Sequence, residues 1–137
     1  MLEIRALVWL LISAAALRAR PYDRIARRWL QASGSTARDD ARARRIALAV
    51  HRAARVVRPR PSCLARALAA GRLLARERLD ARVIIGVTPG AGVPADFAAH
   101  AWLTHGALVL SGAEAGRVYL PLCAIDAASR PVFVTLP

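Results

Sequence analysis

Two prolines within four residues, at positions 58–61 (Arg-Pro-Arg-Pro), interrupt the helical first part of this chain, which is followed by a part with a different hydrophobic period. Proline lacks the backbone N–H that a helix needs, and it disfavours helical geometry at the residue before it. Before this segment the apolar residues recur every three or four positions, as in helices; after residue 81 they alternate, as in strands. Helices followed by strands predict an α+β fold with an antiparallel sheet.

Three helices are predicted before the two prolines. Residues 4–18 are apolar on nearly all sides, as in a fully buried helix. Residues 22–30 form a short basic amphipathic segment, and residues 33–36 (Ser-Gly-Ser-Thr) form a linker. Thr36 is a suitable N-cap for a helix over residues 37–57, in which most arginines would line a solvated face.

A fourth helix and several strands are predicted after the prolines. Ser62 is a natural N-cap, which places Cys63 at the first position of a helix that runs to about Arg78. A tight turn is expected at His105-Gly106 and a Gly/Pro loop over residues 89–95. The strands are expected at residues 82–88, 97–104, 107–110, 117–120 and 132–136.

The formal charge of +12 is large for a chain of 137 residues. The chain has no Lys, no Asn and a single Gln, whereas Ala and Arg are abundant, which indicates a coding bias that replaces Lys with Arg. The charge is therefore weak support for nucleic-acid binding, and no recognition motif or aromatic platform accompanies it. Such a surface would still attract acidic peptides and polyanions.

The two cysteines, Cys63 and Cys123, form neither a disulfide framework nor a CxxC metal pair. We therefore expect a reducing, cytoplasmic setting, no metal and no cofactor. The apolar run at residues 6–17 is shorter than the roughly 20 residues that span a bilayer. Arginines at 18 and 20 stand where a signal peptide needs small residues, so we expect a buried or partner-facing helix and no transmembrane segment.

Cys63 is the first candidate for chemistry. In the first turn of a helix, the free backbone N–H groups and the positive end of the dipole favour the thiolate, which is the reactive form of cysteine. The same N–H groups can stabilise an oxyanion formed beside the sulfur. Because free cysteine is often simply buried, this position alone does not establish a nucleophile.

His100 is the second candidate, in the middle of the strand expected at residues 97–104. It shares a strand face with Ala98 and Trp102. A histidine on an apolar strand is more often a core residue than a base. A base would have to come within hydrogen-bond reach of the thiol, closer than about 4 Å with substrate bound.

Three motifs carry a family resemblance: SCLARAL at residues 62–68, VIIGV at 83–87 and AHAWL at 99–103. Together they resemble the leader peptidases of lasso-peptide biosynthesis, the transglutaminase-like half of a split maturation protease. The resemblance is clearest over residues 59–122. It implies a single transglutaminase-like, papain-like peptidase domain over residues 1–137, with a helical N-terminal part (1–57) and the catalytic helix and sheet (62–137).

The resemblance also implies an activity. Such enzymes cut a ribosomally made precursor at the junction of leader and core, and they act with a small recognition-element protein that holds the leader. A separate ATP-using macrolactam synthetase then closes the core. The family's nucleophile corresponds to Cys63 and its histidine to His100. We further expect the apolar N-terminal helix and an exposed Trp9, Ile25 or Trp29 to form a surface for the recognition-element protein or its bound leader.

The third catalytic residue is open. The family usually has an acidic residue about a dozen positions after the histidine, to hold the imidazole tautomer. Here that neighbourhood reads Leu-Ser-Gly, and Ser111 would lie roughly opposite His100. The remaining candidates are Glu114, Asp126 and Asp96, or the site is a dyad.

The other histidines and two further functions complete the predictions. His51, on the arginine-rich helix, and His105, in the turn, are expected at the surface, and Cys123 is expected to be a structural thiol.

The first alternative function is a transglutaminase-like acyl transferase that uses an amine in place of water. The second is a non-enzymatic adaptor at a membrane or partner surface, based on the apolar N-terminus and the arginine-rich helices.

Overall fold

The computed structural model describes residues 1–31, 36–87, 99–111, 120–125 and 132–133. The predicted order of helices and then strands is confirmed. The elements are α1 (Leu2–Ala19), α2 (Tyr22–Trp29), α3 (Asp40–Val56), α4 (Cys63–Arg76), β1 (Arg82–Val87), β2 (Ala99–His105), β3 (Leu108–Ser111), β4 (Leu120–Ile125) and β5 (Val132–Phe133).

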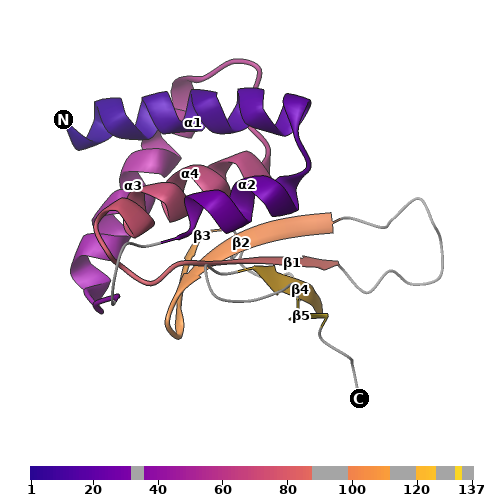
Figure 1. Cartoon of the computed structure of the whole chain (residues 1–137). Coiled ribbons are helices and arrows are strands. Elements are labelled where there is room, and N and C mark those ends of the chain that lie inside the picture. The colour runs from indigo at the N-terminus through magenta and orange to yellow at the C-terminus, as the bar shows by residue number, and fades with distance from the viewer. Residues whose placement is uncertain (32–35, 88–98, 112–119, 126–131, 134–137) are drawn as a thin grey trace.

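The strands form one antiparallel sheet with the order β3-β2-β1-β4-β5, and the helices cover one of its faces (Figure 1). Helix α4 lies against β2, and α1 forms the outer layer over α3 and α4. The core between α4 and the sheet is closed by Leu68, Leu73 and Leu74 from the helix and by Val83 and Leu103 from the strands, all of them buried. The sheet therefore offers a fixed platform on which the start of α4 is held.

Several predicted boundaries differ from the structure. Helix α3 begins at Asp40, and its N-cap is Asp39, whose carboxylate accepts a hydrogen bond from the Arg42 N–H at 2.9 Å; Thr36 is not the cap. Asp is as good a cap as Thr, and Ala37 is engaged elsewhere, because its N–H donates to the Arg78 carbonyl at 2.8 Å. The fourth strand runs over Leu120–Ile125, later than predicted. The loop predicted at residues 89–95 lies outside the described residues.

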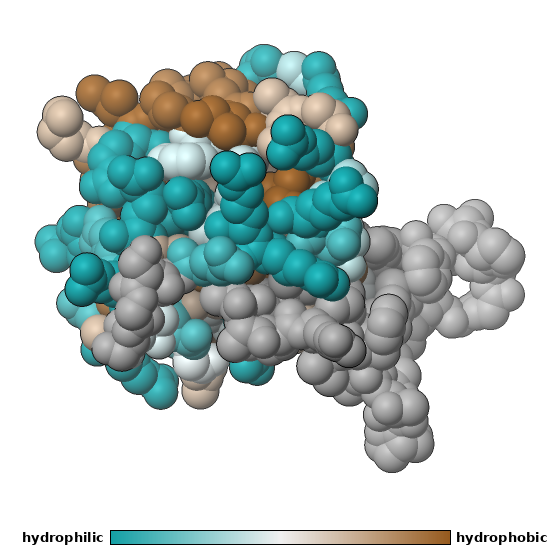
Figure 2. Space-filling model, in the orientation of Figure 1, coloured by the Kyte–Doolittle hydropathy of each residue, from teal (hydrophilic) through white to brown (hydrophobic). Residues whose placement is uncertain are grey.

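Helix α1 is not fully buried, so of the two expectations for it, buried or partner-facing, the first does not hold for the whole helix. Ala6, Leu10 and Ser13 are buried, but Ile4, Val8, Leu11 and Ile12 are 40–61% exposed and give one face of α1 an apolar surface (Figure 2). Within the described residues, no helix combines the length and hydropathy that a membrane span requires.

Of the three residues predicted to form an exposed partner surface, Ile25 is buried, so that part of the prediction is wrong. Trp9 and Trp29 are half-buried. Their rings pack edge to face, with centroids 5.4 Å apart.

Candidate active site

The start of α4 has the cap that its sequence predicts. The Ser62 hydroxyl oxygen accepts a hydrogen bond from the Ala65 N–H at 3.1 Å, and the Ser62 carbonyl accepts one from the Arg66 N–H. Cys63 is the first residue of the helix and its thiol is partly exposed. The N–H groups of Cys63 and Leu64 have no acceptor inside the helix, because the first N–H groups of any helix lack one. These donors lie beside the sulfur and can hold an anion.

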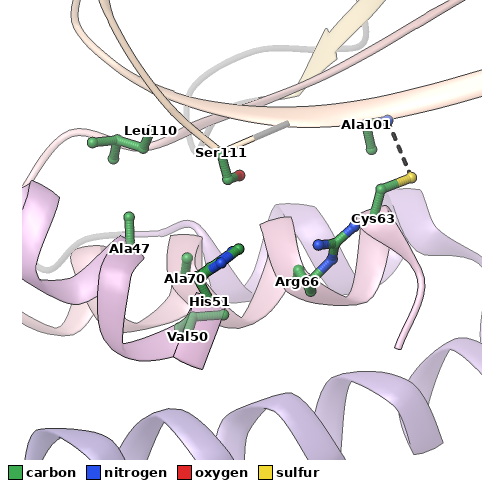
Figure 3. Close-up of a pocket in the computed structure, with 9 residues that line it drawn as sticks. All are labelled: Ala47, Val50, His51, Cys63, Arg66, Ala70, Ala101, Leu110 and Ser111. Atoms are coloured by element: carbon green, nitrogen blue, oxygen red, sulfur yellow. Dashed lines mark hydrogen bonds between the residues drawn. The ribbon is translucent and has the colours of Figure 1, made fainter. Parts of the chain in front are cut away.

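The thiol of Cys63 contacts the edge of β2. Its Sγ atom accepts a hydrogen bond from the Ala101 backbone N–H at 3.4 Å (Figure 3). Among the described residues, β3 pairs with β2 from Leu103, opposite Ser111, to His105, which leaves the Ala101 N–H free for the sulfur. This hydrogen bond fixes the position of the sulfur at the edge of β2.

His100 is the residue immediately before this contact. It is 9% exposed, and its ring lies next to that of Trp102, with centroids 6.4 Å apart and planes 25° apart. The two side chains share a strand face, as predicted, while Ala101 and Leu103 are buried on the other face, toward the helices. The structure thus brings Cys63 to the backbone next to His100, whose side chain lies on the strand face opposite to Ala101.

A pocket opens next to the thiol, between α3, α4 and the ends of β2 and β3. It is lined by Ala47, Val50, His51, Cys63, Arg66, Ala70, Ala101, Leu110 and Ser111. In Figure 3 the side chains of Cys63, Arg66 and His51 point toward the strands, and Ser111 points back toward the helices. His100 is not among the lining residues.

Two polar atoms of this pocket are buried without a hydrogen-bond partner in the part of the chain that the structure describes: Arg66 Nε and Ser111 Oγ. Buried polar groups normally have hydrogen-bond partners, so these two atoms are available to bind a ligand or water. One is a donor in a cation and the other a hydroxyl that can donate or accept. The pocket can therefore bind a polar group while its alanines and Val50 contact an apolar stem.

Ser111 does not serve as the orienting partner of His100. It pairs with Leu103 instead of His100, and its hydroxyl has no hydrogen-bond partner among the described residues. The register differs from the prediction because the hairpin turn is centred on Gly106-Ala107 and the pairing shifts between Leu103 and Thr104. Glu114, Asp126 and Asp96 lie outside the described residues.

His51 is exposed, as predicted, but sequence reasoning missed its place beside Cys63. Twelve positions and two prolines separate these residues in the sequence, and only the packing of α3 on α4 brings them to one pocket. Cys123, predicted to be a structural thiol, lies in β4 and pairs with Ile85 and Phe133.

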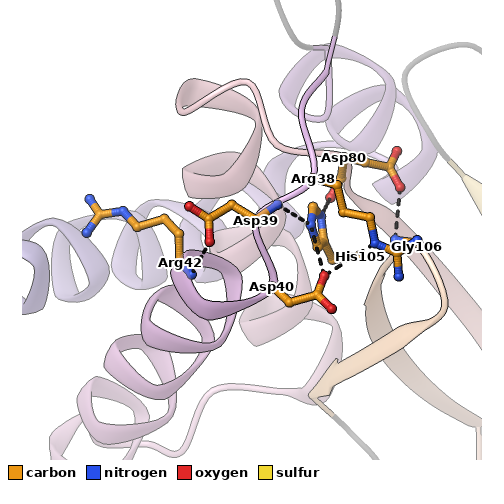
Figure 4. A network of polar contacts seen from close by, with 7 residues as sticks. All are labelled: Arg38, Asp39, Asp40, Arg42, Asp80, His105 and Gly106. Carbon is orange, nitrogen blue, oxygen red and sulfur yellow. Dashed lines mark hydrogen bonds and ion pairs between the residues drawn. The ribbon is translucent and has the colours of Figure 1, made fainter.

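The prediction that His105 is a surface residue is wrong, because its side chain is fully buried. Its Nε2 atom accepts a hydrogen bond from the Asp39 N–H at 3.2 Å, which requires the proton on Nδ1. Nδ1 then donates to the Asp80 carbonyl at 2.7 Å (Figure 4). His105 thus ties the start of α3 to the segment that enters β1, a structural role at a distance from the thiol.

No cluster of three or more metal-ligating side chains occurs among the described residues. The chemistry available at the start of α4 is that of a thiol, backbone donors, a guanidinium and imidazoles.

The described geometry is that of a thiol at a helix start held against an antiparallel sheet. A family model described as the transglutaminase-like superfamily matches residues 7–123, and the chain belongs to that superfamily. No curated protein and no solved structure gives a match. Membership is consistent with cysteine peptidase or acyl transferase activity.

Proposed function

We propose that this chain is a cysteine peptidase in which Cys63 is the nucleophile and His100 the general acid and base. The observation that carries the proposal is the hydrogen bond between Cys63 Sγ and the N–H of Ala101, the residue next to His100. It places a helix-start thiol at the strand that bears the histidine, in a chain of the transglutaminase-like superfamily.

In the first half-reaction the Cys63 thiolate attacks the carbonyl carbon of the scissile peptide bond. The developing oxyanion is held by the N–H groups of Cys63 and Leu64 at the start of α4. His100, as the imidazolium, donates its proton to the departing amine nitrogen, and the C–N bond breaks. A thioester between Cys63 and the N-terminal part of the substrate remains.

In the second half-reaction water attacks the thioester. Neutral His100 removes one proton from the water, the C–S bond breaks, and the Cys63 thiolate is regenerated with His100 as imidazolium. The product leaves as a carboxylic acid, which releases its remaining proton to solvent and becomes a carboxylate. If an amine replaced water, the same intermediate would give a new amide, which is the acyl transferase alternative.

The substrate that we propose is the leader–core junction of a ribosomally made lasso-peptide precursor, with the leader held by a recognition-element protein in the cytoplasm. The resemblance of residues 62–68, 83–87 and 99–103 to lasso leader peptidases supports this proposal. The pocket beside Cys63 fits a residue next to the scissile bond, whose polar atoms would satisfy Arg66 Nε and Ser111 Oγ.

The test is cleavage of a precursor peptide encoded beside this protein, with the purified recognition-element protein present. Mass spectrometry should show the free leader with the mass of one added water and the core with a free amine. A product in which leader and an added amine are joined would replace the peptidase proposal by the acyl transferase. Equal cleavage with and without the recognition-element protein would overturn the proposed partner. An unreactive Cys63 thiol, alkylated slowly and independently of pH, would favour the non-enzymatic adaptor.

A further inference from the structure

A second hollow lies on the other side of the helical layer, between α1, α2 and the C-terminal half of α4. The edge-to-face pair Trp9 and Trp29 contributes to its lining, with Ile12 beside them. In Figure 2 the apolar surface of α1 borders the hydrophilic side chains of α2. None of the residues that line this groove lines the pocket of Cys63.

Arg72 reaches into the groove from α4. Its guanidinium carbon lies 5.3 Å from the centroid of the Trp9 ring, and one terminal nitrogen donates to the Trp29 carbonyl at 3.3 Å. Its Nε is buried and has no hydrogen-bond partner among the described residues. A guanidinium carries five donors, and the hydrogen bond to Trp29 uses one of them.

More arginines surround it: Arg20, Arg24 and Arg28 line the groove, and Arg76 lies 5.9 Å from the Trp9 ring. Among the described residues, no Asp or Glu lines the groove. The ion pairs of the described residues involve none of these arginines. Burial lowers the pKa of Arg72, and the charges of Arg76 and Arg28 lower it further. The groove thus holds positive charges that repel one another and have no counterion in the described chain.

The arginines and the apolar side chains of the groove together indicate what kind of ligand fits it. Carboxylates are the groups that a guanidinium fork binds best, in bidentate geometry. The tryptophan rings and Ile12 add an apolar surface, which a free inorganic anion would leave uncovered. A flat anionic membrane would contact the exposed stripe of α1, but its headgroups would not fill a concave site. A peptide supplies carboxylates and apolar side chains together.

We propose that this groove binds an acidic peptide segment, with a carboxylate on Arg72 and an apolar side chain against Trp9. Arg72 is nine positions after Cys63 in α4, which is about 14 Å along the helix axis. The groove is therefore a docking site separate from the reacting thiol.

The test uses a fluorescein-labelled synthetic peptide of alternating Glu, Leu and Ala residues, and a second peptide with Gln in place of every Glu. Fluorescence anisotropy measures the binding of both to the full chain. The groove variant is Arg24→Glu combined with Arg28→Glu. The control is Arg44→Glu combined with Arg52→Glu, because these arginines of α3 are also exposed and the change in net charge is the same.

We expect the groove variant to weaken binding of the Glu peptide by roughly tenfold or more, since two charge-assisted contacts become repulsive. The control should lose less than about threefold, as expected for screened, distant charges. Arg72→Gln should also weaken binding of the Glu peptide, and the Gln peptide should bind weakly to every form.

Equal losses in the groove variant and the control would overturn the proposal, because binding would then follow net charge alone. Equal binding of the Glu and Gln peptides would overturn it as well. So would binding of phosphatidylglycerol vesicles that depends on Arg24 and Arg28 while the Glu peptide shows no such dependence. The assay involves no cleavage, so its failure would leave the peptidase proposal standing, and failure of Cys63-dependent cleavage would leave this proposal standing.

Discussion

The Sγ atom of Cys63 lies 3.4 Å from the backbone nitrogen of Ala101 and accepts its hydrogen bond at the edge of β2. The contact joins residues 38 positions apart and fixes the thiol at the histidine-bearing strand. A thiol in this position is useful for catalysis only if it reacts as a nucleophile.

Replacing Cys63 by Ala should abolish precursor cleavage and leave the fold intact. Removal of a nucleophile that forms the covalent intermediate typically costs more than about 10³-fold in rate. The thiol is partly exposed, so the melting temperature should change little. Cleavage is measured by mass spectrometry and folding by circular dichroism; full activity in this variant would contradict the assignment of the nucleophile.

His100→Ala and His51→Ala separate two candidate bases. Loss of the general acid and base should lower the cleavage rate by about 10²–10⁴-fold in the His100 variant. His51 is exposed and lines the pocket, so its loss should change KM more than kcat. The reverse pattern, a large kcat loss for His51→Ala with an active His100→Ala enzyme, would transfer the role of base to His51.

Ser62→Ala should destabilise the protein by about 1 kcal/mol, because the cap of α4 loses its acceptor for the Ala65 N–H. It should also slow alkylation of Cys63 by iodoacetamide, since the helix start that supports the thiolate becomes frayed. Thr36→Ala is the matched control: Thr36 is exposed and caps no helix, so urea unfolding should show a change within about 0.5 kcal/mol. Equal destabilisation in both variants would contradict the capping role of Ser62.

The features that sequence could predict are those set by neighbouring residues. The Ser62 cap, the position of Cys63 and the breaks at the prolines follow from local backbone chemistry, and all appear in the structure. The Ser111 register could not be predicted because it depends on where the hairpin turns and on a shift in pairing next to Thr104. The position of His51 beside the thiol depends on how α3 packs on α4, and no local sequence pattern predicts that packing. The exposed face of α1 could not be predicted either, because apolar residues occur on every side of this helix.

Glu77→Gln should remove part of the acid sensitivity of the fold. Arg42 donates two hydrogen bonds to the Glu77 carboxylate, at 2.5 and 2.8 Å, and they lower the pKa of Glu77. Because the folded-state pKa is depressed, the stabilisation is present above the unfolded value of about 4.3 and is lost as pH falls through the folded-state pKa. The unfolding free energy of wild type should therefore exceed that of Glu77→Gln at pH 7, and the difference should shrink toward pH 3. A difference that stays constant from pH 7 to pH 3 would contradict this account.

His105→Ala should be the most destabilising of these substitutions. It would leave the Asp39 N–H and the Asp80 carbonyl without their partner and open a cavity where a fully buried ring stood. An unsatisfied buried group and a core cavity each cost on the order of 1–3 kcal/mol. We therefore expect a loss of about 2–4 kcal/mol in urea unfolding. The exposed His51, replaced by Ala, is the control and should change stability by less than about 0.5 kcal/mol.

The His105 variant should retain Cys63-dependent cleavage at a temperature where it is folded, because His105 binds the start of α3 and the entry to β1 and not the thiol. Loss of cleavage in a folded His105→Ala protein would show instead that this histidine acts in the reaction.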